Sequence, residues 1–225
     1  MAIGRIGSRG AALLLGVAAL ASYAPAARAE DAVGVSVPES VEVEPKAWAF
    51  SLTAFGYRGA DEPAYGYATF MADRDRLHLE ARYGYEDRHT ASLWAGMNFE
   101  VGDALKLSAT PMVGGVFGET QGVAAGYELT LAYKRFELYT EGEYLHDLNV
   151  EQDSYFYSWS ELSYEPCDRW RVGLVAQRTK AYGTDLDIQR GFLVGLSLDS
   201  VELTAYVLNL GFDTPIFALS ISFEF

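Results

Sequence analysis

The chain has 225 residues, half of them hydrophobic, yet no apolar run reaches the roughly 20 residues that a membrane-spanning helix requires. A helical membrane protein is therefore excluded. Its 31 acidic residues outnumber 17 basic ones, and a net charge of −14 argues against nucleic acid as a partner. The single cysteine, Cys167, rules out an internal disulfide.

The first 29 residues have the order of a secretory signal peptide. Arg5 and Arg9 precede an apolar run at 11–21, and Ala27 and Ala29 are the small residues expected at a cleavage site. We expect export through the Sec pathway and cleavage after Ala29. Removing this segment takes away three arginines and no acid, which leaves 14 basic residues against 31 acidic ones and a net charge of −17.

Residues 30–45 are rich in Val, Glu and Pro and have no apolar face to bury. We interpret them as a flexible periplasmic lead-in, with a small plug inside a barrel as the alternative. From residue 46 to the end at 225, apolar and polar residues alternate for about ten positions and then break at Gly, Asp, Asn or Pro, which is the period of a two-faced strand. The segments predict twelve strands, with ten as the alternative, at 48–57, 64–72, 76–86, 91–101, 105–113, 123–134, 136–144, 154–164, 170–177, 188–198, 201–210 and 216–225.

The clearest alternation lies at 76–86. Its apolar positions are Leu77, Leu79, Ala81, Tyr83 and Tyr85, and its polar positions are Arg76, His78, Glu80, Arg82, Gly84 and Glu86. Two segments depart from the rule. Pro111 interrupts one strand and predicts a bulge. Tyr155, Tyr157 and Trp159 share a face with Glu161, so a bulge near Ser160 is expected to reconcile them.

A soluble barrel would have to bury the carboxylates of the ionic face or fill a wide interior with apolar side chains. Lipid on the apolar face and water on the ionic face remove both problems, and closure pairs every backbone group. The sequence thus predicts an all-β, antiparallel, up-and-down transmembrane barrel. Tight breaks at 73–75, 102–103, 134–135 and 199–200 alternate with longer loops at 115–122, 146–153 and 181–187, and the tight turns are expected in the periplasm.

The final strand carries alternating apolar residues and ends on an aromatic one: Phe217, Leu219, Ile221, Phe223 and Phe225. It resembles the C-terminal recognition strand of bacterial outer-membrane β-barrel proteins. The resemblance implies an outer-membrane location and an assembly machinery that reads Phe225, Phe223 and Ile221. In size the chain is also similar to small twelve-stranded porins for acidic oligosaccharides, but those line their lumens with arginine, whereas this lumen is acid-rich.

The strand assignments predict charged, inward-facing side chains that would line a pore. They are Arg76, Glu80, Arg82, Glu100, Lys106, Glu128, Glu137, Glu141, Glu143, Arg171 and Glu202. Such a lumen favours cations, and we expect a narrow, passive, porin-like channel for small solutes in which Glu137, Glu141 and Glu143 set selectivity. The alternative is a closed structural barrel that contacts lipopolysaccharide and whose lumen is filled by Arg–Glu pairs.

An outer-leaflet lipid-modifying enzyme is the second alternative, which requires a histidine beside a nucleophile. His78 falls on the ionic face, and His89 and His146 fall in loops without a recognisable triad, so no enzyme is expected. Arg178 and Arg190 interrupt the apolar face and are expected to contact lipopolysaccharide phosphates. Asp185 and Asp187 could hold a divalent ion, but solvated loop acids are commoner, and no metal or cofactor is predicted.

Overall fold

A computed structural model describes residues 47–59, 64–150, 153–181, 185–211 and 213–225 of the chain. The expected signal peptide and lead-in lie outside these residues. Within them, no helix is long and apolar enough to cross a membrane. The strands are β1 (Ala49–Gly59), β2 (Tyr65–Arg74), β3 (Leu77–Tyr83), β4 (Thr90–Met97), β5 (Phe99–Val101), β6 (Leu105–Gly118), β7 (Gly122–Tyr133), β8 (Phe136–Asp147), β9 (Tyr155–Cys167), β10 (Trp170–Ala181), β11 (Asp187–Leu198), β12 (Val201–Leu208) and β13 (Ile216–Glu224).

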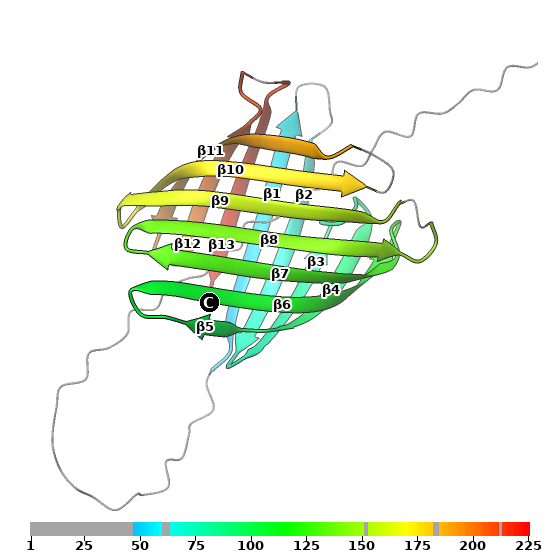
Figure 1. The fold of residues 1–225 in the computed structure, drawn as a ribbon, viewed down its shortest axis with the longest axis horizontal. Coiled ribbons are helices and arrows are strands. Elements are labelled where there is room, and N and C mark those ends of the chain that lie inside the picture. Colours follow the sequence, from blue (N-terminus) through cyan, green and yellow to red (C-terminus); the bar gives the residue numbers. More distant parts are fainter. Residues whose placement is uncertain (1–46, 60–63, 151–152, 182–184, 212) are drawn as a thin grey trace, which may run out of the picture.

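The strands form one closed antiparallel barrel (Figure 1). Each strand pairs with its neighbours in the sequence, and β13 pairs with β1 from Ser51 opposite Glu224 to Gly59 opposite Ile216. Beyond this ladder, the backbones of Phe50 and Phe225 exchange two hydrogen bonds of 3.0 Å. No sheet edge remains between the first and last strands, which is what a barrel in lipid requires.

β4 and β5 are two parts of one strand, so the barrel has twelve strands. Gly96 pairs with Met112 of β6, and Phe99 pairs with Ala109, which keeps a single register across the gap. The gap lies opposite Pro111, whose nitrogen carries no hydrogen to donate to the ladder. The predicted bulge at Pro111 is therefore wrong: the proline removes pairing without adding a residue, and its pairing with β7 is also continuous.

β9 also lacks the expected bulge near Ser160, because its pairing with β8 and β10 is continuous from Tyr155 to Tyr164. The register shifts instead near the turn, between Trp170 and Val172 of β10. Tyr155, Tyr157 and Trp159 consequently stay on the same inward face as Glu161, and all four are buried. The alternation rule predicted that large aromatic rings face the lipid, whereas these three rings are buried inside the barrel.

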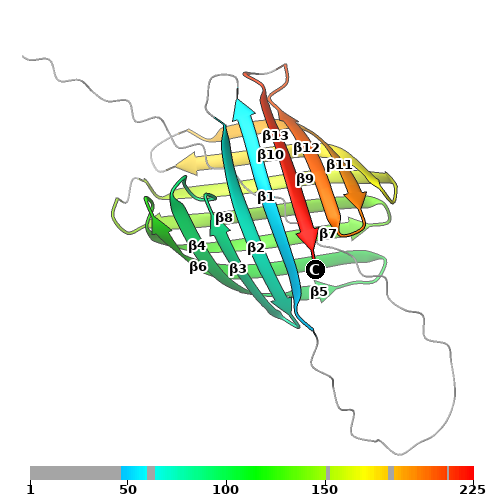
Figure 2. The ribbon, with the colours of Figure 1, turned by 180° about the vertical axis from the view of Figure 1, so that it is seen from behind.

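The outward face of the wall is mostly apolar. Leu93, Val113 and Phe217 are exposed by 63%, 65% and 59%, whereas their strand neighbours Ser92, Met112 and Ala218 are buried. Figures 1 and 2 show that the strands of one wall, β6 to β11, run steeply across those of the other, which contains β1, β2, β12 and β13. Side chains from these opposite walls meet inside the barrel, as Phe55 meets Trp159.

The connections differ in length between the two ends of the barrel. Turns of two or three residues follow β2, β5, β7, β9 and β11, while loops of three to seven residues follow β1, β3, β6, β8, β10 and β12. The predicted loop at 115–122 is mostly strand, because β6 continues to Gly118 and β7 starts at Gly122. Asp75, Lys134 and Asp199 each begin a two-residue turn with a left-handed backbone (φ 50° to 57°), which suits tight hairpins. We call the end of the barrel with the short turns the turn end, and the opposite end the loop end.

Candidate functional site: the charged and aromatic contacts across the lumen

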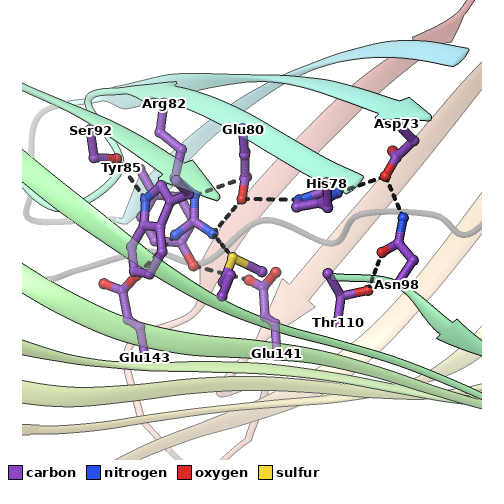
Figure 3. A network of polar contacts seen from close by, with 12 residues as sticks. Asp73, His78, Glu80, Arg82, Tyr85, Ser92, Asn98, Thr110, Glu141 and Glu143 are labelled. Carbon is purple, nitrogen blue, oxygen red and sulfur yellow. Dashed lines mark hydrogen bonds and ion pairs between the residues drawn. The ribbon is translucent and has the colours of Figure 1, made fainter. Parts of the chain in front are cut away.

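Arg82 is the centre of the main buried cluster. Alternation along β3 points both Glu80 and Arg82 inward, and the guanidinium holds the Glu80 carboxylate with two hydrogen bonds of 2.8 Å. Its third contact is Arg82 Nη1 to Glu143 Oε2 at 2.9 Å. The guanidinium also lies 4.2 Å from the ring centroid of Tyr85 (Figure 3) and 4.5 Å from that of Trp94. Charge-assisted, bidentate bonds and aromatic faces fix the orientation of this arginine.

The Arg82–Glu143 contact spans the interior. β3 and β8 are not neighbours in the wall, because β4, β6 and β7 lie between them on the shorter side. Tyr85 makes a second contact of this kind: its hydroxyl donates a hydrogen bond to Glu141 of β8 at 3.1 Å. The two walls are therefore joined by polar contacts, and the lumen is narrowed where they meet.

Tyr85 departs from the predicted outward face. Gly84, with φ 75°, ends β3 and reverses the alternation, so that Tyr85 and Glu86 both turn inward and are buried. Burial raises the pKa of Glu86 above its ordinary value, even though Arg82 and a 2.5 Å hydrogen bond from Ser92 favour its charged form. A left-handed backbone of this kind suits glycine.

A chain of polar contacts leads from the Arg82 cluster toward the turn end (Figure 3). His78 Nδ1 lies 2.9 Å from Asp73 Oδ1, and its Nε2 lies 3.8 Å from Glu80 Oε2. Asn98 donates to Asp73 at 2.6 Å and accepts from Thr110 at 2.7 Å. The chain crosses β2, β3, β6 and the break between β4 and β5, so it also braces the wall at the unpaired gap.

Aromatic rings make a second set of contacts across the lumen. Phe55 of β1 stacks on Tyr67 of β2 at 4.9 Å between centroids, and meets Trp159 of β9 edge-on at 6.1 Å. Tyr206 of β12 lies 5.4 Å from Trp159 and 5.6 Å from Phe55. Since β1 and β9 lie far apart around the wall, these rings form an aromatic bridge through the interior.

A second buried arginine organises the other side of the lumen. Arg171 Nη1 lies 2.6 Å from Glu161 Oε2, and its Nη2 lies 3.1 Å from Glu202 Oε1. Trp159 donates its indole N–H to Glu161 at 2.8 Å, which joins this cluster to the aromatic bridge. Tyr67 of the bridge also meets Tyr85 edge-on at 5.5 Å, beside Arg82. The charged and aromatic contacts are therefore one continuous interior structure.

Carboxylates exceed arginines inside the barrel. Glu128 of β7 stands directly opposite Glu141 of β8, and Glu128 Oε1 is buried without a hydrogen-bond partner. Glu141 accepts from the hydroxyls of Tyr85 and Tyr139, which are neutral donors. Two carboxylates facing each other in this way favour the entry of a cation or a proton.

Most of the predicted pore-lining residues face inward, at different depths. Those buried in the two arginine clusters are Glu80, Arg82, Glu141, Glu143 and Arg171. Those half-buried toward the turn end are Lys106, Glu128, Glu137 and Glu202, while Glu100 is exposed at the same end.

Arg76 is misplaced in the prediction. The turn lies at Asp75 and Arg76 rather than at 73–75, and Arg76 is exposed with its guanidinium 5.8 Å from the ring centroid of outward-facing Phe99. It therefore lies at the barrel rim and does not line the lumen. A left-handed Asp75 makes the turn one residue later than the polar run suggested.

Sequence reasoning missed the inward aromatic residues, since it assigned nearly every ring to the lipid face. The available signal was parity: Tyr155, Tyr157 and Trp159 alternate in phase with Glu161, and Tyr139 alternates in phase with Glu137 and Glu141. Such rings fill the interior that charged side chains alone leave open.

The histidines and loop acids do not form a catalytic group or a metal group. His89 is exposed in the loop after β3, whereas His146 lies in β8 with its side chain outward, not in a loop as predicted. Among the described residues, no three His, Cys, Asp or Glu side chains are placed to hold a metal ion. Asp185 and Asp187 are exposed.

Arg178 and Arg190 occupy exposed outward positions near the loop end of β10 and β11, and Ile221, Phe223 and Phe225 lie on the closing strand or just after it. Both placements match the faces that the sequence predicted. The roles expected of these residues, lipopolysaccharide contact and recognition by the assembly machinery, are interactions with other molecules and stay predictions.

No model of a protein family matches the sequence, and no curated protein matches it either. Solved structures do match the fold. The KdgM porin superimposes with a TM-score of 0.55 at 8% identity, covering 78% of this chain and 99% of its own. The KdgM porin in complex with disordered oligogalacturonate gives a TM-score of 0.56 at 9% identity, covering 79% and 99%. This is the barrel fold of a porin.

Proposed function

We propose that the protein is an outer-membrane channel of narrow bore for small solutes. The observation that carries the proposal is the inverted barrel: apolar side chains cover the outside of a closed twelve-stranded wall, and charged side chains face the interior. In that arrangement, lipid contacts the apolar outer surface and water contacts the charged inner surface. The likeness to porin structures supports the same reading.

The contacts across the lumen set the expected size of the solute. Arg82 with Glu143, and Phe55 with Trp159, bridge opposite walls, so the route through the barrel is divided and narrow. Large oligosaccharides are too wide for such a route. Oligogalacturonate, the ligand of one KdgM porin structure, is also an acidic polymer, and the excess of inward carboxylates here disfavours it.

A cation preference follows from the same charges. The interior carboxylates Glu128, Glu137 and Glu141 are not matched one for one by the buried cations Arg82 and Arg171. A ring of carboxylates concentrates cations at the constriction and repels anions. We therefore propose small cations and neutral solutes as the permeating species.

Single-channel recording of the refolded protein in a planar bilayer tests the proposal. A steady conductance is expected, with a reversal potential in a salt gradient that shifts toward the cation equilibrium potential. A reversal potential of the opposite sign would contradict the cation preference, and silence at all voltages would contradict the channel. Refolding is checked separately by the heat-dependent shift of the folded barrel on a gel.

A closed structural barrel is the second candidate, and the continuous interior structure favours it. The Arg82 cluster, the aromatic bridge and the Arg171 cluster together connect β1, β3, β8, β9, β10 and β12 through the lumen. A barrel braced in this way needs no conduction to explain its buried charges. Silent bilayers formed with correctly folded protein would support this candidate. Catalysis is not proposed, because none of the three histidines belongs to a recognisable triad.

A further inference from the structure

The loop between β3 and β4 turns into the lumen at the loop end of the barrel. Gly84, with φ 75°, directs the next two side chains inward, and Tyr85 and Glu86 are only 3% and 1% exposed. A Cβ atom on Gly84 would lie 3.1 Å from the carbonyl oxygen of Gly66, so both the backbone conformation and the available space favour glycine there. We call residues 84–86 the inward segment.

Tyr85 holds the inward segment against the opposite wall. Its hydroxyl donates a hydrogen bond to Glu141 of β8 at 3.1 Å (Figure 3), and its ring meets Tyr157 of β9 edge-on at 6.2 Å. The same ring meets Tyr67 of β2 at 5.5 Å. The inward segment therefore crosses the lumen, and a solute that enters the barrel from the loop end has to pass it.

Glu86 is incompletely paired in this position. Its Oε1 accepts a hydrogen bond from Ser92 at 2.5 Å and lies 3.9 Å from Arg82 Nη1, whereas its Oε2 is buried without a hydrogen-bond partner. The same guanidinium nitrogen lies 2.9 Å from Glu143 Oε2, and Glu80 takes two further hydrogen bonds from Arg82. One cation thus serves three carboxylates, and its contact with Glu86 is the longest.

The surroundings of Glu86 favour its protonated form. Burial has the largest influence and raises the pKa of Glu86, while Arg82 and the Ser92 hydroxyl lower it and Glu80 raises it further. The titratable and charged groups that act on Glu86, or on which it acts, come from β2, β3, β8 and β9: they are Tyr65, Glu80, Arg82, Glu143 and Tyr155.

Ionisation of Glu86 in this position would leave a charged oxygen buried and unpaired, which is costly. Contact with water removes that cost, because water hydrates the carboxylate. The inward position therefore suits the protonated acid, and a position displaced toward water suits the ionised one.

We propose that the inward segment is an acid-operated lid, which closes the loop end of the lumen while Glu86 is protonated and moves aside when Glu86 is ionised. Closing takes one proton from the solvent and opening returns it, so a fall in pH favours the closed lid. The longer loops assign this end of the barrel to the cell exterior, so the lid responds to the external pH. Its effect on conduction rests on the proposed channel, whereas its movement does not.

Hydrogen–deuterium exchange of the refolded barrel in detergent tests the movement without any conduction. After correction for the intrinsic effect of pH, the amides of residues 84–90 are expected to exchange several-fold faster at pH 8 than at pH 5. Glu86→Gln, a neutral analogue of the protonated acid, should lose this difference. Glu119→Gln changes an exposed acid at the same end and should keep it. The same pH dependence in the wild type and in Glu86→Gln would overturn the lid.

Single-channel recording tests the effect on conduction. The conductance of the wild type is expected to fall several-fold from pH 8 to pH 5, whereas Glu86→Gln should keep the lower conductance at both pH values. Equal wild-type conductance at both pH values would overturn the lid and leave the channel standing. Silent bilayers together with pH-dependent exchange would contradict the channel and leave the lid standing.

Tyr85→Phe tests the contact that closes the lid. The variant lacks the hydrogen bond to Glu141 and should conduct more than the wild type at pH 5. Tyr83→Phe is the matched control, because Tyr83 lies two residues earlier with its side chain 58% exposed on the outer face. Equal conductance of the two variants at pH 5 would contradict the closing contact. The heat-dependent gel shift of each variant shows separately whether the barrel has folded.

Discussion

Arg82 and Glu143 meet inside the barrel at 2.9 Å although 61 residues and three strands of the wall separate them. This contact joins a wall strand near the N-terminus of the barrel to one from its middle. Both side chains are buried, and Glu80 and Tyr85 complete the surroundings of the guanidinium. The pair is thus the centre of the polar cluster that joins the two walls.

Arg82→Met is expected to weaken the barrel and to widen the route through it. Removing the cation leaves the buried carboxylates of Glu80 and Glu143 without their arginine partner, which costs about 3–5 kcal/mol. The urea midpoint of unfolding in detergent micelles should fall, and single-channel conductance should rise. Arg88→Met, at an exposed loop position, is the control and should change neither. An unchanged midpoint in Arg82→Met would show that the cluster does not brace the walls.

Glu128→Gln is expected to reduce cation selectivity while leaving the fold intact. Glu128 lies directly opposite Glu141 on the adjacent strand, and its unpartnered oxygen contributes negative charge to the interior. Neutralising it removes a like-charge repulsion, so stability should rise by up to about 1 kcal/mol. The reversal potential in a salt gradient should move toward zero. Glu119→Gln, in an exposed loop, serves for comparison, and a shift of equal size there would assign selectivity to surface charge.

Phe55→Ala is expected to break the aromatic bridge. The ring contacts Tyr67, Trp159 and Tyr206, and its loss should cost about 3–5 kcal/mol, as for other buried phenylalanines. Near-ultraviolet circular dichroism should weaken, because Trp159 loses a fixed neighbour, and conductance should increase. Phe217→Ala removes a ring that is 59% exposed on the lipid face. Its near-ultraviolet spectrum should stay close to that of the wild type, and a similar loss in both variants would argue against the bridge.

Gly114→Ala is expected to destabilise the barrel by about 1–3 kcal/mol through overpacking. A Cβ atom at Gly114 would lie 2.4 Å from an atom of the Trp94 ring, which is itself held beside Arg82. Gly56→Ala is the matched strand glycine, because its Cβ would have its nearest neighbour at 3.8 Å. Urea midpoints of the two variants measure the difference. Equal midpoints would mean that Trp94 can move aside freely.

Glu86→Gln is expected to flatten part of the dependence of stability on pH. Burial raises the pKa of Glu86 in the folded barrel above the ordinary value of 4.5. Between those two pKa values the folded state binds more protons than the unfolded state, so the free energy of unfolding increases as the pH falls through this window. The variant lacks this increase and should lose the corresponding slope. Urea midpoints from pH 8 down to pH 5 measure it, and parallel curves for both proteins would contradict the raised pKa.

The alternation of residue types was enough to predict twelve strands, their approximate bounds and the turn end of the barrel. Each of these is a local property: the side-chain period of two decides which residues share a face, and Gly, Asp or Asn decides where a hairpin turns. The inward positions of Glu80, Arg82 and Glu143 follow from the same rule. The rule failed where the backbone left the extended conformation, at Gly84 and at the Asp75 turn.

The choice of partners inside the lumen was decided by the tertiary structure alone. Nothing along β3 indicates that Arg82 meets Glu143, and nothing along β1 indicates that Phe55 meets Trp159. Both contacts depend on the curvature of the wall and on how closely opposite walls approach. The same alternation also fits an interior filled by water or by rings, since both avoid placing carboxylates in lipid. A sequence pattern reports the face on which a side chain lies, whereas the distance across the barrel arises only when all twelve strands close.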